Sequence, residues 1–248
     1  MSLDWLVARP IAHRGWHDRP AGRIENAPAA LAAAVEAGFA IEIDVQAARD
    51  GEAMVFHDAT LDRLVGRPGA VRDHDAADLA AMTLRDGRGD AIPTLPSALA
   101  LVAGRTPLVV EIKSAFDGDM RLADRVAALA AAYGGPIALK SFDPDVIAHL
   151  RAAGVGVPLG VVAEAAYDHP EWAGLAPERR RALAAFLHWS RTRPDFLSWN
   201  VNDWPHPTPH LLRAALGRPV MTWTVRTPAQ WAQARRFADQ AVFEGAPL

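Results

Sequence analysis

The sequence predicts an α/β fold of the closed (β/α)8, TIM-type barrel class, and three observations support this prediction. Short runs of β-forming residues alternate with Ala/Leu/Arg stretches of helical spacing, which is typical of parallel βαβ units. About eight such repeats follow one another without a linker rich in Pro, Gly or Ser, so we expect residues 1–248 to form a single domain. The length of 248 residues is also typical of one barrel. On pattern alone, an open doubly wound sheet remains the alternative.

The expected strands are short, apolar and rich in β-forming residues. They lie at Pro10–His13, Ala40–Val45, Ala53–His57, Leu108–Lys113, Ile137–Ser141, Leu159–Val162, Phe196–Trp199, Val220–Val225 and Ala241–Glu244. Asp50-Gly51 predicts a tight hairpin turn, so we expect Ala53–His57 to return antiparallel to the strand before it.

The expected helices lie at Ala27–Ala37, Leu122–Ala132, Pro144–Ala153, Pro177–Trp189, Thr208–Leu216 and Pro228–Ala238. Residues that helix starts prefer occur at Ser97, Asp143-Pro144 and Thr227-Pro228. The polar stretch Ala59–Pro96 is dense in Arg and Asp and only weakly periodic. We expect it to be a small insertion after the second strand and its hairpin, lying over one end of the barrel.

The composition excludes several function classes. A net charge of -3 and a pI near 6.3 argue against a nucleic-acid partner. The absence of cysteine excludes disulfides, thiolate nucleophiles and Cys-based zinc sites. No window resembles a signal peptide or a membrane span, so we expect a cytoplasmic protein without a membrane span.

Acidic residues recur near the carboxyl ends of two expected strands. Glu42 and Asp44 are two positions apart, so a strand places both carboxylates on one face, and Glu111 occurs in a similar strand. Such a pair is usually a solvated edge, but the flanking apolar runs place these carboxylates inside the barrel. Carboxylates about 4 Å apart repel by roughly 4 kcal/mol per pair at an effective dielectric of about 20, so the cluster needs a proton, a basic partner or a cation. Three oxygen ligands without cysteine favour one divalent cation, Mg2+ or Ca2+.

Histidines and basic residues lie at the same strand ends. His57 alone is more often structural than catalytic, but beside a metal His13 and His57 could exchange protons near neutral pH. Arg14 and Lys113 supply the cations that a phosphate group requires.

Three other positions each have two interpretations. Glu25-Asn26 either caps the first helix or supports the substrate or the metal, and we expect Asn26 to contact substrate. Trp199 and Trp223 either pack in the core or line the pocket, and we expect Trp223 to be a substrate-binding residue.

The motifs occur together in the order of a known family. They are His13-Arg14-Gly15, Glu25-Asn26, Glu42-x-Asp44, His57-Asp58 with Leu61 and Arg63, Pro93-Thr94-Leu95, Glu111-Ile112-Lys113, Ser141-Phe142 and Thr222-Trp223-Thr224-Val225. In this ordered set, from about Ile11 to Val225, the chain resembles the glycerophosphodiester phosphodiesterase family. The resemblance implies a (β/α)8 barrel with a small insertion. It also implies metal ligands (Glu42, Asp44, Glu111), an acid/base pair (His13, His57) and phosphate ligands (Arg14, Lys113).

Three positions depart from the family pattern. Arg226 stands where the family usually has Asn, Val242-Phe243-Glu244-Gly245 replaces an Asp-Gly-Ile-x-Thr-Asp type of sequence, and Ala27 stands where Thr or Ser is common. None of them is an expected metal ligand or proton carrier. We expect these positions to lie on the far wall of the pocket, so the departures leave the identity of the leaving alcohol open.

The implied activity is metal-dependent hydrolysis of a small-molecule glycerophosphodiester, in lipid and glycerol metabolism, to glycerol 3-phosphate and an alcohol such as choline or ethanolamine. In the family picture the substrate's neighbouring hydroxyl attacks the phosphorus, and water then opens a cyclic phosphate. A lysophospholipase D-like activity, which favours an apolar rim, and a non-catalytic barrel that binds phosphorylated head groups are the alternatives. The sequence leaves four points open: the leaving alcohol, the identity of the ion, the division of roles between the two histidines, and the oligomeric state, for which a homodimer is one possibility.

Overall fold

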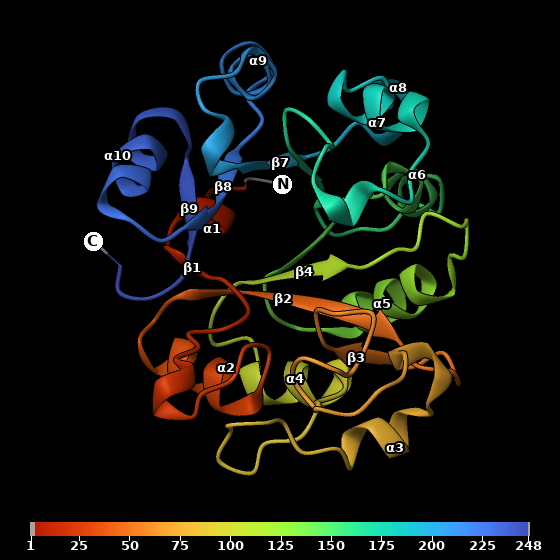
Figure 1. The fold of residues 1–248 in the computed structure, drawn as a ribbon. Coiled ribbons are helices and arrows are strands. Elements are labelled where there is room, and N and C mark those ends of the chain that lie inside the picture. The colour runs from red at the N-terminus through yellow and green to blue at the C-terminus, as the bar shows by residue number, and fades with distance from the viewer. Residues whose placement is uncertain (1–2, 248) are drawn as a thin grey trace.

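The protein contains a closed barrel of eight parallel strands (Figure 1). The structure is a computed structural model and describes residues 3–247. Around the barrel the strand order is β1-β9-β8-β7-β6-β5-β4-β2, and β1 pairs with β2 to close it. The strands are β1 (Ile11–Ala12), β2 (Ala40–Ala47), β4 (Leu108–Ile112), β5 (Ile137–Ser141), β6 (Leu159–Ala163), β7 (Phe196–Asn200), β8 (Val220–Val225) and β9 (Gln240–Phe243). The predicted barrel is therefore confirmed, and the open sheet is excluded.

The predicted hairpin is also confirmed. β3 (Ala53–Val55) runs antiparallel to β2, with Val45 opposite Val55. Gly51 adopts φ 86° in the turn, a left-handed conformation that glycine reaches without a steric penalty.

Helices cover the outside of the barrel (Figure 1). They are α1 (Asp4–Val7), α2 (Pro28–Glu36), α3 (Ala76–Ala80), α4 (Leu95–Val102), α5 (Arg121–Ala132), α6 (Pro144–Ala152), α7 (Pro177–Ala184), α8 (Trp189–Thr192), α9 (Pro207–Leu216) and α10 (Pro228–Phe237). Short 3-10 turns occur at Arg19–Ala21, Val71–Asp73, Pro170–Trp172 and Val201–Asp203. Within residues 3–247, no helix has both the length and the apolar character that crossing a membrane requires.

Helix starts agree with the sequence better than helix ends do. Asp143 and Thr227 both cap their helices through side-chain oxygens. The helix expected from Ser97 begins earlier, at Leu95, because Thr94 accepts a hydrogen bond from the Ser97 backbone N–H. The single helix expected over Pro177–Trp189 is wrong, because Phe186 adopts φ 57° and separates α7 from α8.

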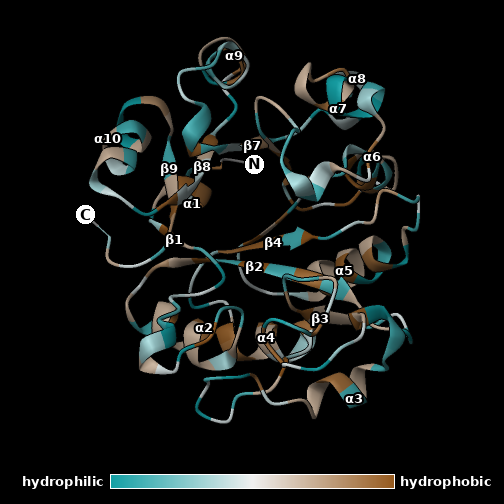
Figure 2. Ribbon diagram, in the orientation of Figure 1, coloured by the Kyte–Doolittle hydropathy of each residue, from teal (hydrophilic) through white to brown (hydrophobic). Residues whose placement is uncertain are grey.

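The barrel interior changes from apolar to polar within two residues along the strands. The apolar layer consists of Ile11, Ala40, Val109, Ala138, Phe196, Met221 and Val242, with Leu6 of α1 against it. Two positions further, on the same face of each strand, are His13, Glu42, Glu111, Lys140, Ser198, Trp223 and Glu244. In Figure 2, β2 and β4 turn from brown toward teal as they approach their carboxyl ends. The period-2 alternation thus places a polar layer on an apolar floor.

One glycine is needed for this floor. A Cβ added at Gly160 on β6 would lie 2.3 Å from the Phe196 ring. The missing side chain lets the Phe196 ring fill the barrel interior.

The insertion Ala59–Pro96 has an apolar cluster of its own. This cluster includes Leu61, Leu64, Val71, Leu79 and Ile92, and it packs against Ile24, Met54 and Phe56. The stretch therefore lies beside β3 and the segment before α2, and its first residue, Ala59, lines the pocket described next.

Candidate active site

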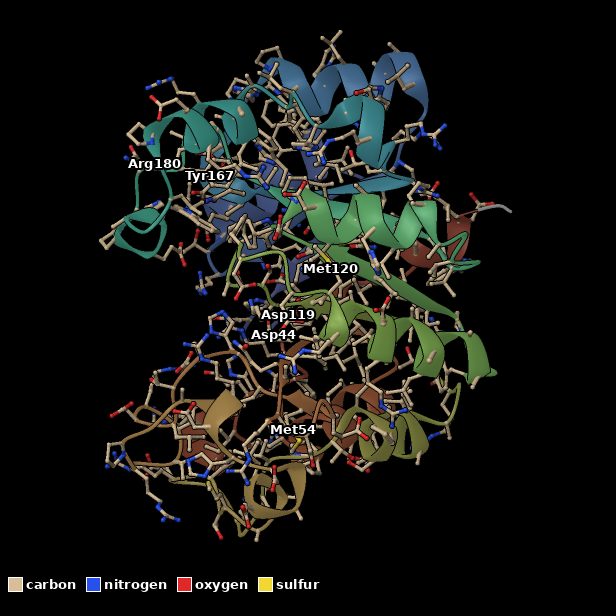
Figure 3. All side chains as sticks on the ribbon, turned by 90° about the vertical axis from the view of Figure 1, so that its right-hand side faces the viewer. Asp44, Met54, Asp119, Met120, Tyr167 and Arg180 are labelled. Carbon is tan, nitrogen blue, oxygen red and sulfur yellow. The ribbon has the colours of Figure 1, made fainter. Side chains whose placement is uncertain are left out.

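A pocket of about 470 Å3 opens where the barrel strands end. Figure 3 looks toward this end of the barrel, with Asp44 near the centre of the view. Most of the site residues expected from the sequence line the pocket: His13, Arg14, Asp44, His57, Glu111, Lys113 and Trp223. Glu42 is fully buried beside it, at 0% exposure.

The three expected acidic residues meet in space. Glu42, Asp44 and Glu111 each offer an oxygen atom, and these atoms lie within 4.8 Å of one another. The cause is the strand register, which pairs Asp44 with Glu111 across β2 and β4, while Glu42 precedes Asp44 by two positions. All three side chains are buried. Such a cluster is unstable unless positive charge compensates it.

Two lysines supply part of that charge. The Lys113 ammonium lies 2.7 Å from Asp44 Oδ1 and also contacts Glu111 Oε1. Lys140 Nζ lies 3.0 Å from both Glu42 Oε1 and Glu111 Oε2. Lys140 was not expected from the sequence, although it follows the inward-facing Ala138 by two positions and so lies on the same face of β5.

The charge pairs shift the pKa values of their members. Burial alone would raise the pKa of Glu111, but Lys113 and Lys140 hold it at about 2. Burial also disfavours the Asp44 carboxylate, yet Lys113 and Arg14 keep its pKa well below the ordinary value. Burial opposes the charge of Lys113, and the two carboxylates nevertheless raise its pKa. These shifts favour the charged forms of Glu111, Asp44 and Lys113.

The donor set fits a hard divalent cation. It consists of carboxylate oxygens from Glu42, Asp44 and Glu111, with no sulfur ligand in the chain. Lys113 and Lys140 show that positive charge is favoured at this point. Lys113 was expected as a phosphate ligand, and in the structure its ammonium, which lines the pocket, pairs with two of the carboxylates.

His13 is held by an acidic residue from the last strand. Its Nδ1 lies 2.6 Å from Glu244 Oε1, and since a carboxylate only accepts, Nδ1 carries the proton. The other ring nitrogen, Nε2, lies 3.8 Å from Glu42 Oε2. Arg226 fixes Glu244 in turn, at 2.6 Å and 3.0 Å. Burial lowers the pKa of His13, against the opposing effect of the Glu244 hydrogen bond.

Glu244 and Arg226 therefore belong to the site although the sequence analysis gave neither a role. Both had been noted only as departures from the family pattern. The structure brings these two departures into contact with each other and places them behind His13.

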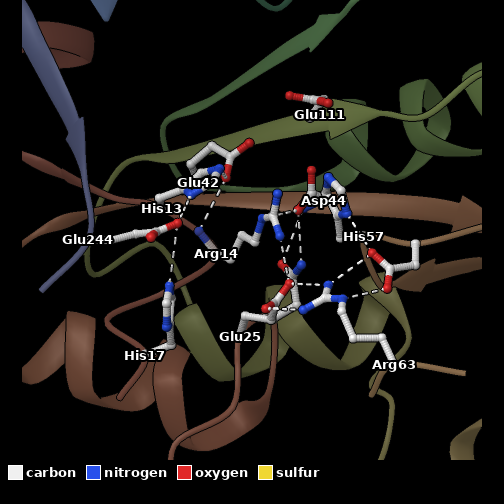
Figure 4. A network of polar contacts seen from close by, with 12 residues as sticks. His13, Arg14, His17, Glu25, Glu42, Asp44, His57, Arg63, Glu111 and Glu244 are labelled. Atoms are coloured by element: carbon white, nitrogen blue, oxygen red, sulfur yellow. Dashed lines mark hydrogen bonds and ion pairs between the residues drawn. The ribbon is translucent and has the colours of Figure 1, made fainter. Parts of the chain in front are cut away.

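His57 has an equivalent arrangement on the other side. Its Nδ1 lies 2.8 Å from Asp58 Oδ1, and Arg63 contacts both Asp58 oxygens. Arg63 also contacts Glu25, which accepts a hydrogen bond from Arg14 at 2.6 Å (Figure 4). One chain of ion pairs therefore joins the His57 side of the pocket to Arg14.

Asn26 supports Asp44. Its side-chain nitrogen donates to Asp44 Oδ2 at 3.0 Å, and its oxygen accepts from the Asp44 backbone N–H at 3.2 Å. Asn26 is 1% exposed and is not among the described residues that line the pocket. Arg14 and Asn26 both adopt left-handed backbone conformations, at φ 56° and 61°, a strained state that clusters at functional sites. Asn26 thus contacts Asp44, while the helix-cap position itself is Ala27.

The two tryptophans have different places. Trp223 lines the pocket and donates its indole N–H to the Ser198 carbonyl at 3.0 Å. Trp199 is fully buried and stacks on His206 in the core. Phe142, from the Ser141-Phe142 motif, also lines the pocket, and so do Phe116 and Trp172, which the sequence analysis did not single out.

Comparisons with known proteins agree with this geometry. The family model "Glycerophosphoryl diester phosphodiesterase family" matches residues 13–244. A protein of Caldanaerobacter subterraneus subsp. tengcongensis named glycerophosphodiester phosphodiesterase is 37% identical over 111 residues, which is 42% of this chain and 44% of that protein. The chain thus spans less than half the length of that curated relative.

Solved structures match over nearly the whole chain. A glycerophosphodiester phosphodiesterase from Thermotoga maritima is 25% identical, with a TM-score of 0.70 over 94% of this chain and 92% of that one. A phosphodiesterase from Oleispira antarctica, solved with the product sn-glycerol-3-phosphate, has a TM-score of 0.76 over 96% and 94% of the two chains. At 21% identity, this second match shows the fold alone.

Proposed function

The chain belongs to the glycerophosphoryl diester phosphodiesterase family, and on this premise we propose that it hydrolyses glycerophosphodiesters to glycerol 3-phosphate and an alcohol. The observation that supports this most directly is the convergence of three buried carboxylates and two histidines around one pocket. We also propose that residues 1–248 act as one catalytic domain.

In this proposal Glu42, Asp44 and Glu111 hold one divalent cation, Mg2+ or Ca2+. When bound, the cation supplies Lewis-acid stabilisation of the charge on the phosphate oxygens. Arg14 and Lys113 line the pocket beside these carboxylates and bind the non-bridging phosphate oxygens. Trp223 contacts the substrate from the wall of the pocket, and Asn26 holds Asp44 in place.

His13 and His57 carry the protons. Each uses Nδ1 to contact a carboxylate, so Nε2 is the nitrogen that remains for proton transfer. One imidazole accepts the proton of the attacking hydroxyl, and the other donates a proton to the oxygen of the leaving alcohol. The attacking group is the glycerol hydroxyl next to the phosphate, which lowers the barrier by pre-positioning. Water then opens the cyclic phosphate.

Glycerol 3-phosphate release from glycerophosphocholine, with and without added Mg2+ or Ca2+, tests the proposal. We expect turnover that stops when a chelator removes the cation. An inactive protein that binds glycerol 3-phosphate would instead support the head-group-binding alternative. A substrate analogue without the neighbouring hydroxyl tests the attacking group, because its efficient cleavage would favour direct attack by water.

A lysophospholipase D-like activity is the second candidate. In its favour, the pocket lining includes apolar aromatic side chains, Phe116, Phe142 and Trp172. Rates on lysophosphatidylcholine, compared with those on glycerophosphocholine, separate the two activities.

A further inference from the structure

Four aromatic rings form one wall of the pocket. Phe142 lies between two tryptophans, with ring centroids 5.0 Å from Trp172 at an interplanar angle of 53° and 5.4 Å from Trp223 at 85°. Phe116 extends the wall beyond Trp172, at 6.1 Å and 89°. Because neighbouring rings are steeply inclined to one another, they do not form one flat stack.

The wall offers π surface and little hydrogen-bonding capacity. The indole N–H of Trp172 is used by Glu164 Oε1 at 2.6 Å, and that of Trp223 by the Ser198 carbonyl at 3.0 Å. These bonds also fix both rings in place. A ligand group that needs hydrogen bonds would therefore find few partners on the rings themselves.

The charge at this wall is negative. Glu171, next to Trp172, lines the pocket, and no ion pair is found for it among residues 3–247. Other polar residues on this side include the neutral Asn200 and Asn202, and Asp143, whose carboxylate pairs with Arg179 at 3.3 Å. Arg226 is a cation at the pocket, but Glu244 pairs with it at 2.6 Å. The pocket thus has basic groups near the carboxylate cluster and a carboxylate near the rings.

We infer that this wall binds a quaternary ammonium group on the leaving alcohol, so that choline esters of glycerol phosphate are the preferred substrates. The inference rests on the proposed function and adds the identity of the alcohol. A trimethylammonium group has no N–H to satisfy, is weakly hydrated, and is attracted to the faces of aromatic rings. A primary ammonium group, by contrast, would lose hydrogen bonds to water against the rings and could regain them only from Glu171 and the two amide side chains. An acyl chain in the same place would meet the carboxylate of Glu171 and the two amide side chains.

The sharpest comparison uses substrates of equal shape. The 3,3-dimethylbutyl ester of glycerol phosphate has the shape of glycerophosphocholine without its positive charge. With Mg2+ or Ca2+ present, we expect kcat/KM for the choline ester to exceed that for the neutral ester by roughly 5- to 30-fold. We expect the ethanolamine ester to be disfavoured as well.

Variants of the wall residues test whether the preference for the choline ester comes from the aromatic wall. In Phe142→Leu and Trp172→Leu the ratio of choline ester to neutral ester should fall toward one, and Glu171→Gln should lower it by a few-fold. Phe237→Leu is the matched control, because Phe237 stacks on Trp204 outside this pocket and its loss should keep the wild-type ratio. Using the ratio removes any general loss of activity from the comparison.

The outcomes separate the two proposals, which are the hydrolase function and the quaternary ammonium site. Equal kcat/KM for the two esters would overturn the quaternary ammonium site and leave the hydrolase proposal standing. Rates that rise with acyl-chain length in lysophosphatidylethanolamines would assign the wall to an acyl chain, and so would also overturn it. If no glycerophosphodiester is hydrolysed, the proposed function fails, and binding then decides the inference. In that case choline, but not 3,3-dimethylbutanol, should shift the Trp172 indole NMR signal, and equal shifts would overturn the site.

Discussion

His13 and His57 each hold a carboxylate through one ring nitrogen and keep the other for proton transfer. We expect His13→Ala and His57→Ala each to lower kcat by about 10²- to 10⁴-fold, the usual contribution of a positioned acid or base. Initial rates at saturating substrate measure this effect. His149→Ala is a suitable control, because His149 lies on α6 and pairs with Asp124 outside the pocket. Wild-type kcat in both active-site variants would contradict the assigned roles.

Glu244 acts through His13, so its removal should affect turnover more than substrate binding. In Glu244→Leu the Nδ1–H loses its acceptor, and we expect kcat to fall by roughly 10- to 100-fold with little change in KM. Glu244→Gln retains an amide oxygen that can accept this hydrogen bond and should recover part of the loss. Nitrogen NMR of the imidazole should show Nδ1 protonated in the wild type and a mixture of tautomers in Glu244→Leu. An unchanged tautomer with unchanged kcat would show that Glu244 has no positioning role.

At this scale the sequence predicted which residues lie together at the strand ends but not how their charges are balanced. Period-2 spacing was enough to place Glu42 and Asp44 on one face, and the structure confirms it. The pairing of Lys140 with Glu42 could not be predicted, because it depends on the register of β2, β4 and β5 around the barrel. The contact of Glu244 with His13 likewise depends on closure of the first strand against the last.

At the scale of elements, helix starts were easier to predict than helix breaks. Thr227 and Asp143 act through local hydrogen bonds that residue type alone indicates. The break between α7 and α8 falls at Ala185-Phe186-Leu187, which contains neither Gly nor Pro. Packing of Phe186 on His188, at 4.4 Å, accompanies its left-handed backbone, and such a tertiary contact has no sequence signal.

The same connection predicts a pH dependence of stability. His188 is 5% exposed, and burial, with help from Arg191 and Arg179, lowers its pKa to about 4. Below pH 6.5 the unfolded chain takes up the proton first, so the free energy of unfolding should fall as the pH drops from about 6.5 toward 4. Between pH 7 and pH 5 we expect His188 to contribute a loss of about 2 kcal/mol.

Urea unfolding of wild type and His188→Leu at both pH values isolates this contribution. The difference between the two proteins removes the effect of all other titrating groups, provided that the rest of the structure is unchanged. The variant should lose about 2 kcal/mol less than the wild type on acidification. Equal losses would show that His188 does not stay neutral in the folded protein.

At the scale of the whole molecule, the alternation of strands and helices was enough to predict the barrel. About eight βα repeats in 248 residues are the number and chain length that a closed (β/α)8 barrel requires. The division of the interior into layers follows from the same period-2 rule: apolar residues such as Val109 and Ala138 form the floor, and Glu111 and Lys140 stand above them. The extra antiparallel strand was predicted from one turn. Apart from Trp223, the aromatic wall was not predicted, since its rings come from β8 and from segments after β4, β5 and β6, and only the assembled barrel brings these together.

The balance of charge in the polar layer predicts how the whole protein responds to metal removal. Lys113, Lys140 and Arg14 offset the carboxylates of the cluster without any added ion. The protein should therefore remain folded with a chelator present, with an unchanged circular dichroism spectrum, while its activity is lost. Binding of Mg2+ or Ca2+ to the folded form alone should raise the free energy of unfolding by about 2.7 kcal/mol when the ion is at 100 times its Kd.

Asp44→Asn tests whether that increment comes from the carboxylate cluster. The variant lacks one charged ligand, so its unfolding midpoint should respond much less to the same ion concentration. Asp86→Asn, a change at an exposed residue paired with Arg19, should keep the wild-type response. Unfolding of the wild type by a chelator alone would mean that the lysines do not compensate the carboxylates. An equal metal response in Asp44→Asn and wild type would place the ion at another site. The ion stabilises the folded protein only through the residues that bind it, so removing a carboxylate that is not a ligand leaves this stabilisation unchanged.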